Sequence, residues 1–238
     1  MSAHRPILLM TRPQPASDRF VASLNPDLVT NTHVVTAPLI RIEHISAAVD
    51  LAAVSGVIFT SANGVKALTA VTGDRNVPAF CVGPATTKAA RDQGWTAHQC
   101  GQDAASLIAS LLETKPAIPL LHVRGRFARG KVAETLTKQG LLCDELVLYD
   151  QVPQTLSEEA TTALESDATV IAPVFSPRTA ALLRHALPGR AIEFVALSPA
   201  VATELDGRAA QGIHVAATPN AEAMRVLVEN LLQSAMPG

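Results

Sequence analysis

The stretch Val57-Ile58-Phe59-Thr60-Ser61-Ala62-Asn63-Gly64-Val65 is a short apolar run that passes into small polar residues. An apolar run without alternation predicts a strand buried on both faces, as in a parallel sheet. The serine that follows the run can cap a helix, because its hydroxyl can accept a hydrogen bond from a free backbone N–H group. The stretch therefore predicts a strand, a turn and a helix, which is the repeating step of a doubly wound α/β fold.

The same step recurs along the chain in a fixed order. Four pairs of segments lie 112 to 117 positions apart, namely Ser61 with Ser176, Gly83 with Ser198, Asp103 with Asn220, and Arg12 with Arg124. In each pair, both members come at the end of an apolar run or at the start of a predicted helix, such as the one over 103–114. Four pairs in one order predict two similar half-molecules, each about the size of a domain.

Two extended segments interrupt the alternation of strands and helices. They are Thr36–Glu43 and Glu145–Pro153, and each contains a proline and some apolar/polar alternation. If they pair as a connector, the chain forms a discontinuous domain (1–36 and 154–238), a linker (37–43 and 145–153) and a continuous domain (44–144). A cut near Lys115-Pro116 into two sequential domains is the alternative, and the residues alone leave both open.

The composition excludes several classes of protein. Of the 238 residues, 48% are hydrophobic and 17% charged, which excludes a disordered chain. A net charge of −2 and 3% aromatic residues argue against nucleic acid as a partner. No apolar run approaches the roughly 20 residues of a membrane helix, so we expect no membrane partner. The segment Met1–Pro6 precedes no cleavable apolar region, which indicates a cytoplasmic protein.

Small polar residues and basic residues gather where the predicted strands end. In open α/β sheets, ligands bind beyond the carboxyl ends of the strands, where helix N-termini favour anions. Each such residue alone is also an ordinary cap or surface charge. Together they favour a site for a carboxylate or a phosphate. The candidates are Arg12, Thr60, Ser61, Asn63, Gly83, Lys88, Arg124, Gly125, Ser176, Arg178 and Ser198.

Signatures of a metal, a cofactor or a covalent nucleophile are missing from the sequence. Gly125–Lys131 has the spacing of a phosphate-binding loop, but Val132 stands where that loop needs a serine or threonine for magnesium. The seven histidines and three cysteines lack metal-ligand spacing, so we expect no metal, no cofactor and reduced thiols.

The only tyrosine, Tyr149, lies in the second extended segment. A phenol there could donate a proton to a leaving hydroxyl group. Alternatively, the ring could simply pack across a pair of strands. The residues leave both interpretations open.

These segments together resemble the uroporphyrinogen-III synthase family over most of the chain. The resemblance lies in the order and spacing of the motifs, because each one alone is weak. The motifs are Phe59–Val65, Val82–Thr86, Gly140–Val152 with Leu148-Tyr149, Phe175–Arg178, Leu197–Pro199 and Thr218–Ala221.

The resemblance implies two flavodoxin-like domains joined by a two-stranded β-ladder, which favours the discontinuous arrangement. It implies a cofactor-free hydro-lyase of heme biosynthesis, which cyclises the linear tetrapyrrole hydroxymethylbilane with inversion of ring D and loss of water. It also implies that Tyr149 is the general acid and that Arg12, Lys88, Arg124 and Arg178 contact substrate carboxylates in a cleft between the domains. Backbone N–H groups at Ser61, Gly83, Ser176 and Ser198 could hold further carboxylates. We expect a monomer with mobile domains.

Two other functions remain as alternatives. A non-catalytic two-domain sensor of a small anion would share the fold and the charge pattern, and a phosphoryl-transfer enzyme would use residues 125–131.

One residue also departs from the expected pattern. Pro173 falls within the predicted strand Thr169–Phe175, and because proline lacks an N–H donor we expect a bulge or a shortened strand there.

Overall fold

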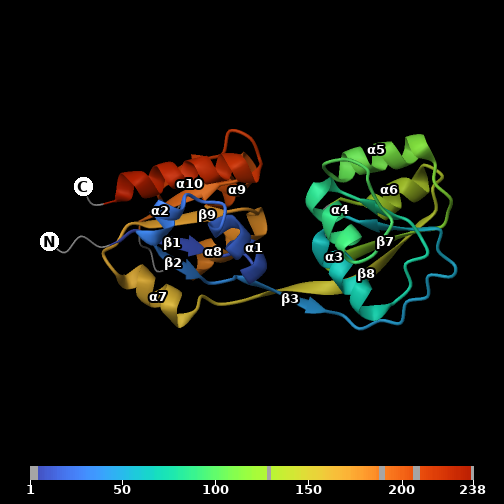
Figure 1. Cartoon of the computed structure of the whole chain (residues 1–238), viewed down its shortest axis with the longest axis horizontal. Coiled ribbons are helices and arrows are strands. Elements are labelled where there is room, and N and C mark those ends of the chain that lie inside the picture. The colour runs from blue at the N-terminus through green and yellow to red at the C-terminus, as the bar shows by residue number, and fades with distance from the viewer. Residues whose placement is uncertain (1–4, 128–129, 188–190, 206–209, 237–238) are drawn as a thin grey trace. The chain divides into compact units, whose positions relative to one another are not determined.

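The computed structural model describes residues 5–127, 130–187, 191–205 and 210–236. By the clustering of its internal contacts, the chain divides into two compact units (Figure 1). Unit 1 comprises Met1–Arg41 and Pro153–Gly238, and unit 2 comprises Ile42–Val152. Each unit is described below by itself.

Unit 1 contains a five-stranded sheet with the order β11-β10-β9-β1-β2, in which every neighbouring pair is parallel. The strands are β1 (Ile7–Met10), β2 (His33–Thr36), β9 (Val170–Val174), β10 (Ile192–Ala196) and β11 (Ala210–Val215). The helices are α1 (Gln14–Val21), α2 (Pro26–Thr30), α7 (Glu158–Glu165), α8 (Pro177–Ala186), α9 (Pro199–Leu205) and α10 (Ala221–Ala235).

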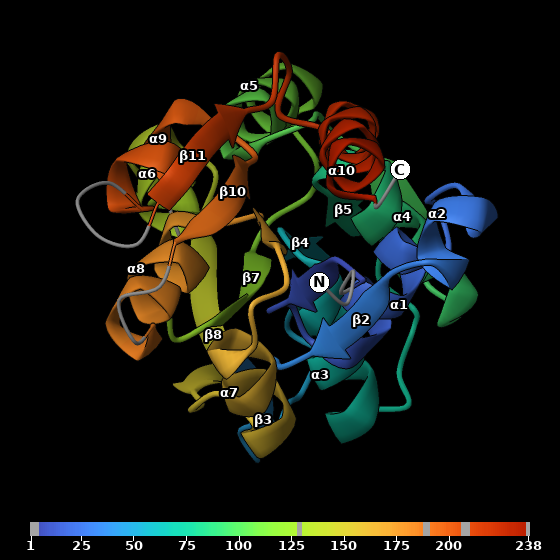
Figure 2. The same cartoon turned by 90° about the vertical axis from the view of Figure 1, so that its left-hand side faces the viewer.

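Helices cover both faces of this sheet, as the sequence predicted for a doubly wound fold. One hydrophobic cluster joins the sheet to α7, α8 and α9, and a second joins it to α1 and α10. Figure 2 shows α10 on the opposite side of β10 from α8. All four residues of β1 are buried, because its side chains enter the two clusters alternately.

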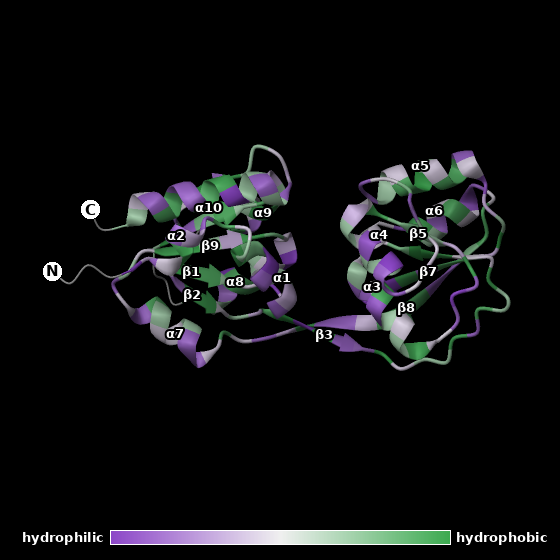
Figure 3. Cartoon of the chain, in the orientation of Figure 1, coloured by the Kyte–Doolittle hydropathy of each residue, from purple (hydrophilic) through white to green (hydrophobic). Residues whose placement is uncertain are grey.

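Unit 2 contains a six-stranded sheet with the order β3-β8-β7-β4-β5-β6. The strands are β3 (Ile40–His44), β4 (Gly56–Phe59), β5 (Ala79–Cys81), β6 (Ala97–Gln99), β7 (Leu120–Gly125) and β8 (Cys143–Pro153). The helices are α3 (Ala62–Val71) and α4 (Gly83–Asp92) on one face, and α5 (Ala104–Thr114) and α6 (Val132–Lys138) on the other. In Figure 3 the inner strand β7 carries the hydrophobic colour and the edge strand β3 the hydrophilic one, while the helices carry both colours.

The two sheets share one strand order although the chain enters them at different points. Reading β2-β1-β9-β10-β11 in unit 1 against β8-β7-β4-β5-β6 in unit 2 pairs each strand with its counterpart. In unit 1 the chain builds the first two of these strands before it enters unit 2. In unit 2 it builds the last three, β4 to β6, before β7 and β8. The predicted repeat therefore corresponds to a repeated strand order.

The predicted helix starts are confirmed. Ser61, Ser176, Asp103 and Asn220 each cap a helix by accepting a hydrogen bond from the backbone N–H three residues later. Helices α4 and α9 begin at Gly83 and Pro199. Lys115, which follows α5, has a φ of 44°, a left-handed conformation that ends the helix.

The expected bulge at Pro173 is absent, and the strand is one residue shorter at each end than the predicted Thr169–Phe175. Strand β9 runs unbroken over Val170–Val174, and its register with β10 passes through Pro173 without a shift. The ladder with β1 pairs only Val170 and Ile171, so the missing donor falls beyond it. Ser176 therefore reaches the start of α8 as its cap.

The described residues contain no helix that is both long and apolar enough to cross a bilayer.

Candidate functional site

Tyr149 of β8 and Ser61 meet in unit 2 where β4 ends and α3 starts. The Tyr149 hydroxyl lies 2.8 Å from Ser61 Oγ, and either oxygen can be the donor. Ser61 Oγ also accepts from the Gly64 N–H at 3.3 Å, which fixes the serine as the helix cap. The tyrosine is 5% exposed and belongs to the same hydrophobic cluster as Phe59. The phenol oxygen is thus held at the N-terminus of α3 by a ring packed in the core.

A register shift in the β7–β8 ladder puts Tyr149 in this position. Arg124 pairs with Val147, but Gly125 pairs with Tyr149, so Leu148 is the extra residue of a bulge. Side chains alternate along a strand, so without the shift Tyr149 would lie on the face of Val147. The bulge brings it to the face of Leu148, toward α3.

Gly125 leaves the space that the Tyr149 ring occupies. A Cβ atom added to Gly125 would lie 2.5 Å from Tyr149 Cε2 and 2.7 Å from Cζ. No real side chain fits at that distance. The sequence singled out Gly125 as a substrate contact, and the structure gives it a packing role beside the tyrosine.

His122 is a buried polar residue of β7. Its side chain is 1% exposed, with Nε2 3.4 Å from Thr60 Oγ1. Its Nδ1 lies 3.8 Å from a Glu145 oxygen and has no hydrogen-bond partner among the described residues. The pKa of His122 is lowered to about 4, mainly by burial and also by the nearby Arg124 charge, against an opposing effect of Glu145. His122 is therefore neutral near neutral pH.

Arg124 is committed to acceptors of its own unit. Its Nη1 donates to Glu145 at 2.5 Å, while Nε and Nη2 donate to the carbonyl oxygens of Gly125 and Arg126, each at 3.2 Å. Glu145 is the partner that sequence reasoning missed. No motif marks it, because only the β7–β8 register, which sets it opposite His122, brings it to this arginine.

The other cations after β7 are paired as well. Arg126 donates to Asp150 at 2.8 Å, and Lys131 lies 2.9 Å from Glu134. Arg129 lies outside the described residues. The lysine that a phosphate-binding loop would use is thus paired with the helix that follows it.

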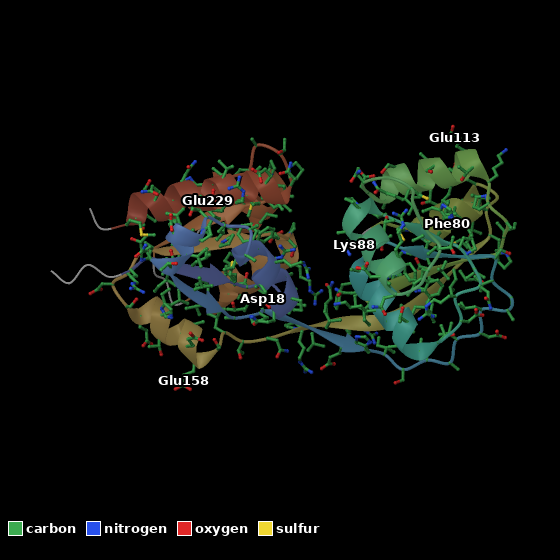
Figure 4. The ribbon with its side chains drawn as sticks, in the orientation of Figure 1. Asp18, Phe80, Lys88, Glu113, Glu158 and Glu229 are labelled. Atoms are coloured by element: carbon green, nitrogen blue, oxygen red, sulfur yellow. The ribbon has the colours of Figure 1, made fainter. Side chains whose placement is uncertain are left out.

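Two expected anion contacts have different surroundings from those predicted. Lys88, labelled in Figure 4, is 77% exposed and forms an ion pair with Asp92 one turn along α4. The Gly83 N–H donates to the Gly101 carbonyl at 2.8 Å, so it is not directed at a ligand. The following residue, Pro84, has no N–H group. The prediction of a backbone carboxylate contact at Gly83 is therefore wrong.

In unit 1 the candidate residues gather around Phe175. The guanidinium of Arg12 lies 4.0 Å from the centre of the Phe175 ring. Burial lowers the pKa of Arg12, and the charge of Arg19 lowers it further. Ser176, the next residue after Phe175, caps α8 and shares its hydroxyl with Thr179 at 2.9 Å. Phe175 belongs to the motif Phe175–Arg178 of the family resemblance, but the sequence does not indicate that its ring contacts an arginine.

The remaining candidates lie at helix starts. Arg178 is the second residue of α8, Asn63 is the second residue of α3, and Ser198 directly precedes α9. The structure therefore divides the predicted site residues into two groups. Those of unit 2 are Thr60, Ser61, Asn63, Gly83, Lys88, Arg124, Gly125 and Tyr149, and those of unit 1 are Arg12, Ser176, Arg178 and Ser198.

The cysteines are free and buried, as the sequence predicted. Burial raises the pKa values of the Cys81 and Cys143 thiols to about 12, which keeps both thiols protonated and unreactive. Within the part of the chain that the structure describes, no group of three or more His, Cys, Asp or Glu side chains could hold a metal ion.

Comparison with known proteins identifies relatives of this fold. The family model described as uroporphyrinogen-III synthase HemD matches residues 31–225. A uroporphyrinogen-III synthetase from Helicobacter pylori is 18% identical, with a TM-score of 0.70 over 95% of this chain and 99% of that one. A mutant uroporphyrinogen III synthase from Thermus thermophilus is 15% identical, with a TM-score of 0.55 over 96% and 99%. No curated protein matches the sequence.

Proposed function

The chain belongs to the uroporphyrinogen-III synthase family, whose members are cyclising hydro-lyases that act on a tetrapyrrole, and on that premise we propose how its residues serve the reaction. The substrate is hydroxymethylbilane, and the product is its macrocycle with ring D inverted. The family match over residues 31–225 is the observation that carries this proposal.

Orientation supplies the selectivity of the reaction. A flexible linear tetrapyrrole closes without help to the uninverted ring, so the enzyme must favour one conformer. The substrate carries many carboxylates, and strand-end groups of both units hold them. Binding a flexible chain at several points removes much of the entropy cost of reaching the reactive conformer. No metal or covalent nucleophile is required for this.

Tyr149 acts as the general acid. It donates the phenol proton to the terminal hydroxyl group, the carbon–oxygen bond breaks, and water leaves. The last ring closure releases a proton, which replaces the one that the phenol donated, so that the reaction loses only water. The 2.8 Å contact with Ser61 orients the phenol, and the negative charge left on its oxygen lies at the N-terminus of α3, where anions are stabilised.

The finer architecture belongs to the same proposal. We place a discontinuous flavodoxin-like domain at 1–36 and 154–238 and a continuous one at 44–144, with 37–43 and 145–153 as a two-stranded ladder. The strand order 2-1-3-4-5 of unit 1, and the same spatial order built in a permuted sequence (5-4-1-2-3, without the edge strand β3) in unit 2, support the flavodoxin-like assignment. The protein acts as a cytoplasmic monomer.

The test is the isomer composition of the product. The protein is incubated with freshly prepared hydroxymethylbilane, the products are oxidised to porphyrins, and the isomers are resolved by chromatography. We expect mainly isomer III, at a rate proportional to the amount of protein. If only isomer I forms, at the rate seen without protein, the proposal is wrong, and an anion sensor becomes the better interpretation.

A further inference from the structure

We propose that the two repeated arginines have unequal roles: Arg12 binds a carboxylate of the substrate, whereas Arg124 is held by Glu145 and positions the strand end beside Tyr149. The proposal rests on the proposed function and deepens it. The family resemblance implied the same role, contact with a substrate carboxylate, for both arginines.

Strand registers establish that the two arginines correspond. Leu8 of β1 pairs with Ile171 of β9, and Leu120 of β7 pairs with Gly56 of β4. Gly56 and Ile171 are separated by 115 positions, the spacing of the Ser61 and Ser176 caps. Leu8 therefore corresponds to Leu120. Four residues further along the chain, Arg12, two residues beyond the end of β1, corresponds to Arg124 of β7.

The neighbouring strand decides what each arginine meets. On β8, Glu145 lies two residues after Cys143, the partner of Leu120. On β2, Thr36 lies two residues after Val34, the partner of Leu8. Thr36 thus takes the place of Glu145. A threonine cannot neutralise a guanidinium. Arg124 therefore has a negatively charged neighbour on the adjacent strand, and Arg12 has a neutral one.

The surroundings of Arg124 leave its charge compensated. Glu145 accepts from it at 2.5 Å, and two carbonyl oxygens take further donors. A substrate carboxylate at Arg124 would have to displace or adjoin the Glu145 carboxylate, and like charges repel. The arginine instead ties β7 to β8 immediately before the bulge that presents Tyr149.

The surroundings of Arg12 leave its charge uncompensated. Among the described residues, no carboxylate lies within ion-pair distance of Arg12. The guanidinium carbon lies 4.0 Å from the centre of the Phe175 ring. A cation on an aromatic face keeps its N–H donors for a bidentate carboxylate. Burial and the charge of Arg19 both disfavour the cation, as the lowered pKa of Arg12 records. A bound carboxylate would relieve both effects.

Three variants test the assignment. Arg12→Gln removes the proposed anchor. The double variant Arg124→Gln with Glu145→Gln removes the compensated pair without leaving a lone charge. Arg12→Lys keeps the positive charge but loses the planar guanidinium group. It replaces Arg12→Gln in the test if that variant does not fold. Circular dichroism verifies the folding of each protein.

Two measurements are made on every variant. The first is kcat and KM with hydroxymethylbilane. The second is the dissociation constant of uroporphyrin III, a stable polycarboxylate, measured by quenching of Trp95 fluorescence or by porphyrin fluorescence. The second does not depend on turnover, so a wild-type protein that makes only isomer I would overturn the proposed function and still leave the carboxylate assignment testable.

For Arg12→Gln we expect KM and the porphyrin dissociation constant to rise about tenfold or more, with kcat changed less than about threefold. For Arg12→Lys we expect a rise of about three- to tenfold. For the double variant we expect a porphyrin dissociation constant within about threefold of wild type and a fall in kcat, because the strand end beside Tyr149 loosens. Equal weakening of porphyrin binding by Arg12→Gln and the double variant, or a larger effect of the double variant, would overturn the proposal.

Discussion

The two units share a strand order and helix caps at matching positions, yet the ends of their central strands differ in chemistry. In unit 2, His122, Arg124 and Glu145 form a polar group beside Tyr149. In unit 1, the corresponding place holds Arg12 on the ring of Phe175. One scaffold thus carries two kinds of strand end, a compensated network in one unit and an uncompensated cation in the other. The two units share a backbone plan, and a few side chains make the ends of their central strands chemically different.

The largest effect that we expect from this difference concerns Tyr149, which has no counterpart in the site of unit 1. Replacing Tyr149 by Phe removes the proposed acid but keeps the ring in its cluster. General acid catalysis contributes about 10²–10⁴-fold, so we expect kcat to fall by at least about a hundredfold with KM changed less than about threefold. Steady-state kinetics on a variant with wild-type circular dichroism measures this. Unchanged turnover would leave the tyrosine with a packing role only.

The second test uses the buried histidine that only unit 2 contains. The pKa of His122 is lowered to about 4 by burial, so between about pH 6.5 and pH 4 the unfolded chain binds a proton that the folded unit does not. The stabilisation by neutral His122 is therefore complete above about pH 6.5 and is lost as the pH falls toward 4. Its size is on the order of 2–3 kcal/mol.

Urea unfolding at several pH values, followed by the fluorescence of Trp95, measures this effect. Trp95 is the only tryptophan and is buried in unit 2, so its signal reports that unit. His122→Gln should flatten the pH dependence between pH 4 and 6.5. Among the described histidines of unit 1, His33 and His185 are exposed and His214 is partly exposed, so none is buried as His122 is. An equal slope in the variant would contradict this account.

The third test compares a glycine from each unit. Gly125→Ala drives a methyl group into the Tyr149 ring, and overpacking of this kind costs about 1–3 kcal/mol. Gly212→Ala meets the ends of two side chains, Glu193 Oε2 at 2.5 Å and His214 Nε2 at 3.0 Å. Moving them breaks only their own partly exposed 2.7 Å contact, so we expect a smaller cost, up to about 1 kcal/mol. Urea titrations by circular dichroism measure both. Equal costs would mean that the tyrosine ring is free to shift.

The smallest effect should come from the matched caps. Ser61→Ala and Ser176→Ala each remove an N-cap, at a cost of about 1 kcal/mol. Each variant also removes a hydroxyl partner, that of Tyr149 for Ser61 and that of Thr179 for Ser176. A threonine hydroxyl in a helix can turn to a carbonyl one turn back, whereas the Tyr149 hydroxyl is held by its packed ring, so we expect Ser61→Ala to cost up to about 1 kcal/mol more than Ser176→Ala. Chemical denaturation of both variants checks the difference. A larger loss for Ser176→Ala would reverse the comparison.

The sequence predicted local structure well because local structure depends on near neighbours. Apolar runs identified the strands, and the residue after each run identified the cap, as at Ser61 and Asn220. The pairing of strands depends on contacts that no short motif encodes. Glu145 therefore went unnoticed as the partner of Arg124, and the bulge at Leu148 could not be read from the pattern. Lys88 looked like an anion contact because its place near a helix start was visible while Asp92 beside it was not considered.

The order in which the chain builds its strands bears on how the protein emerges from the ribosome. Strands β1 and β2 are made first, but β9, the neighbour of β1, lies more than a hundred residues later. All of unit 2 is synthesised in between, as one continuous segment. Domains generally fold as units during synthesis. Unit 2 can thus fold before β9 has been synthesised. During that time one side of the apolar strand β1 has no partner strand, and chaperones can protect it.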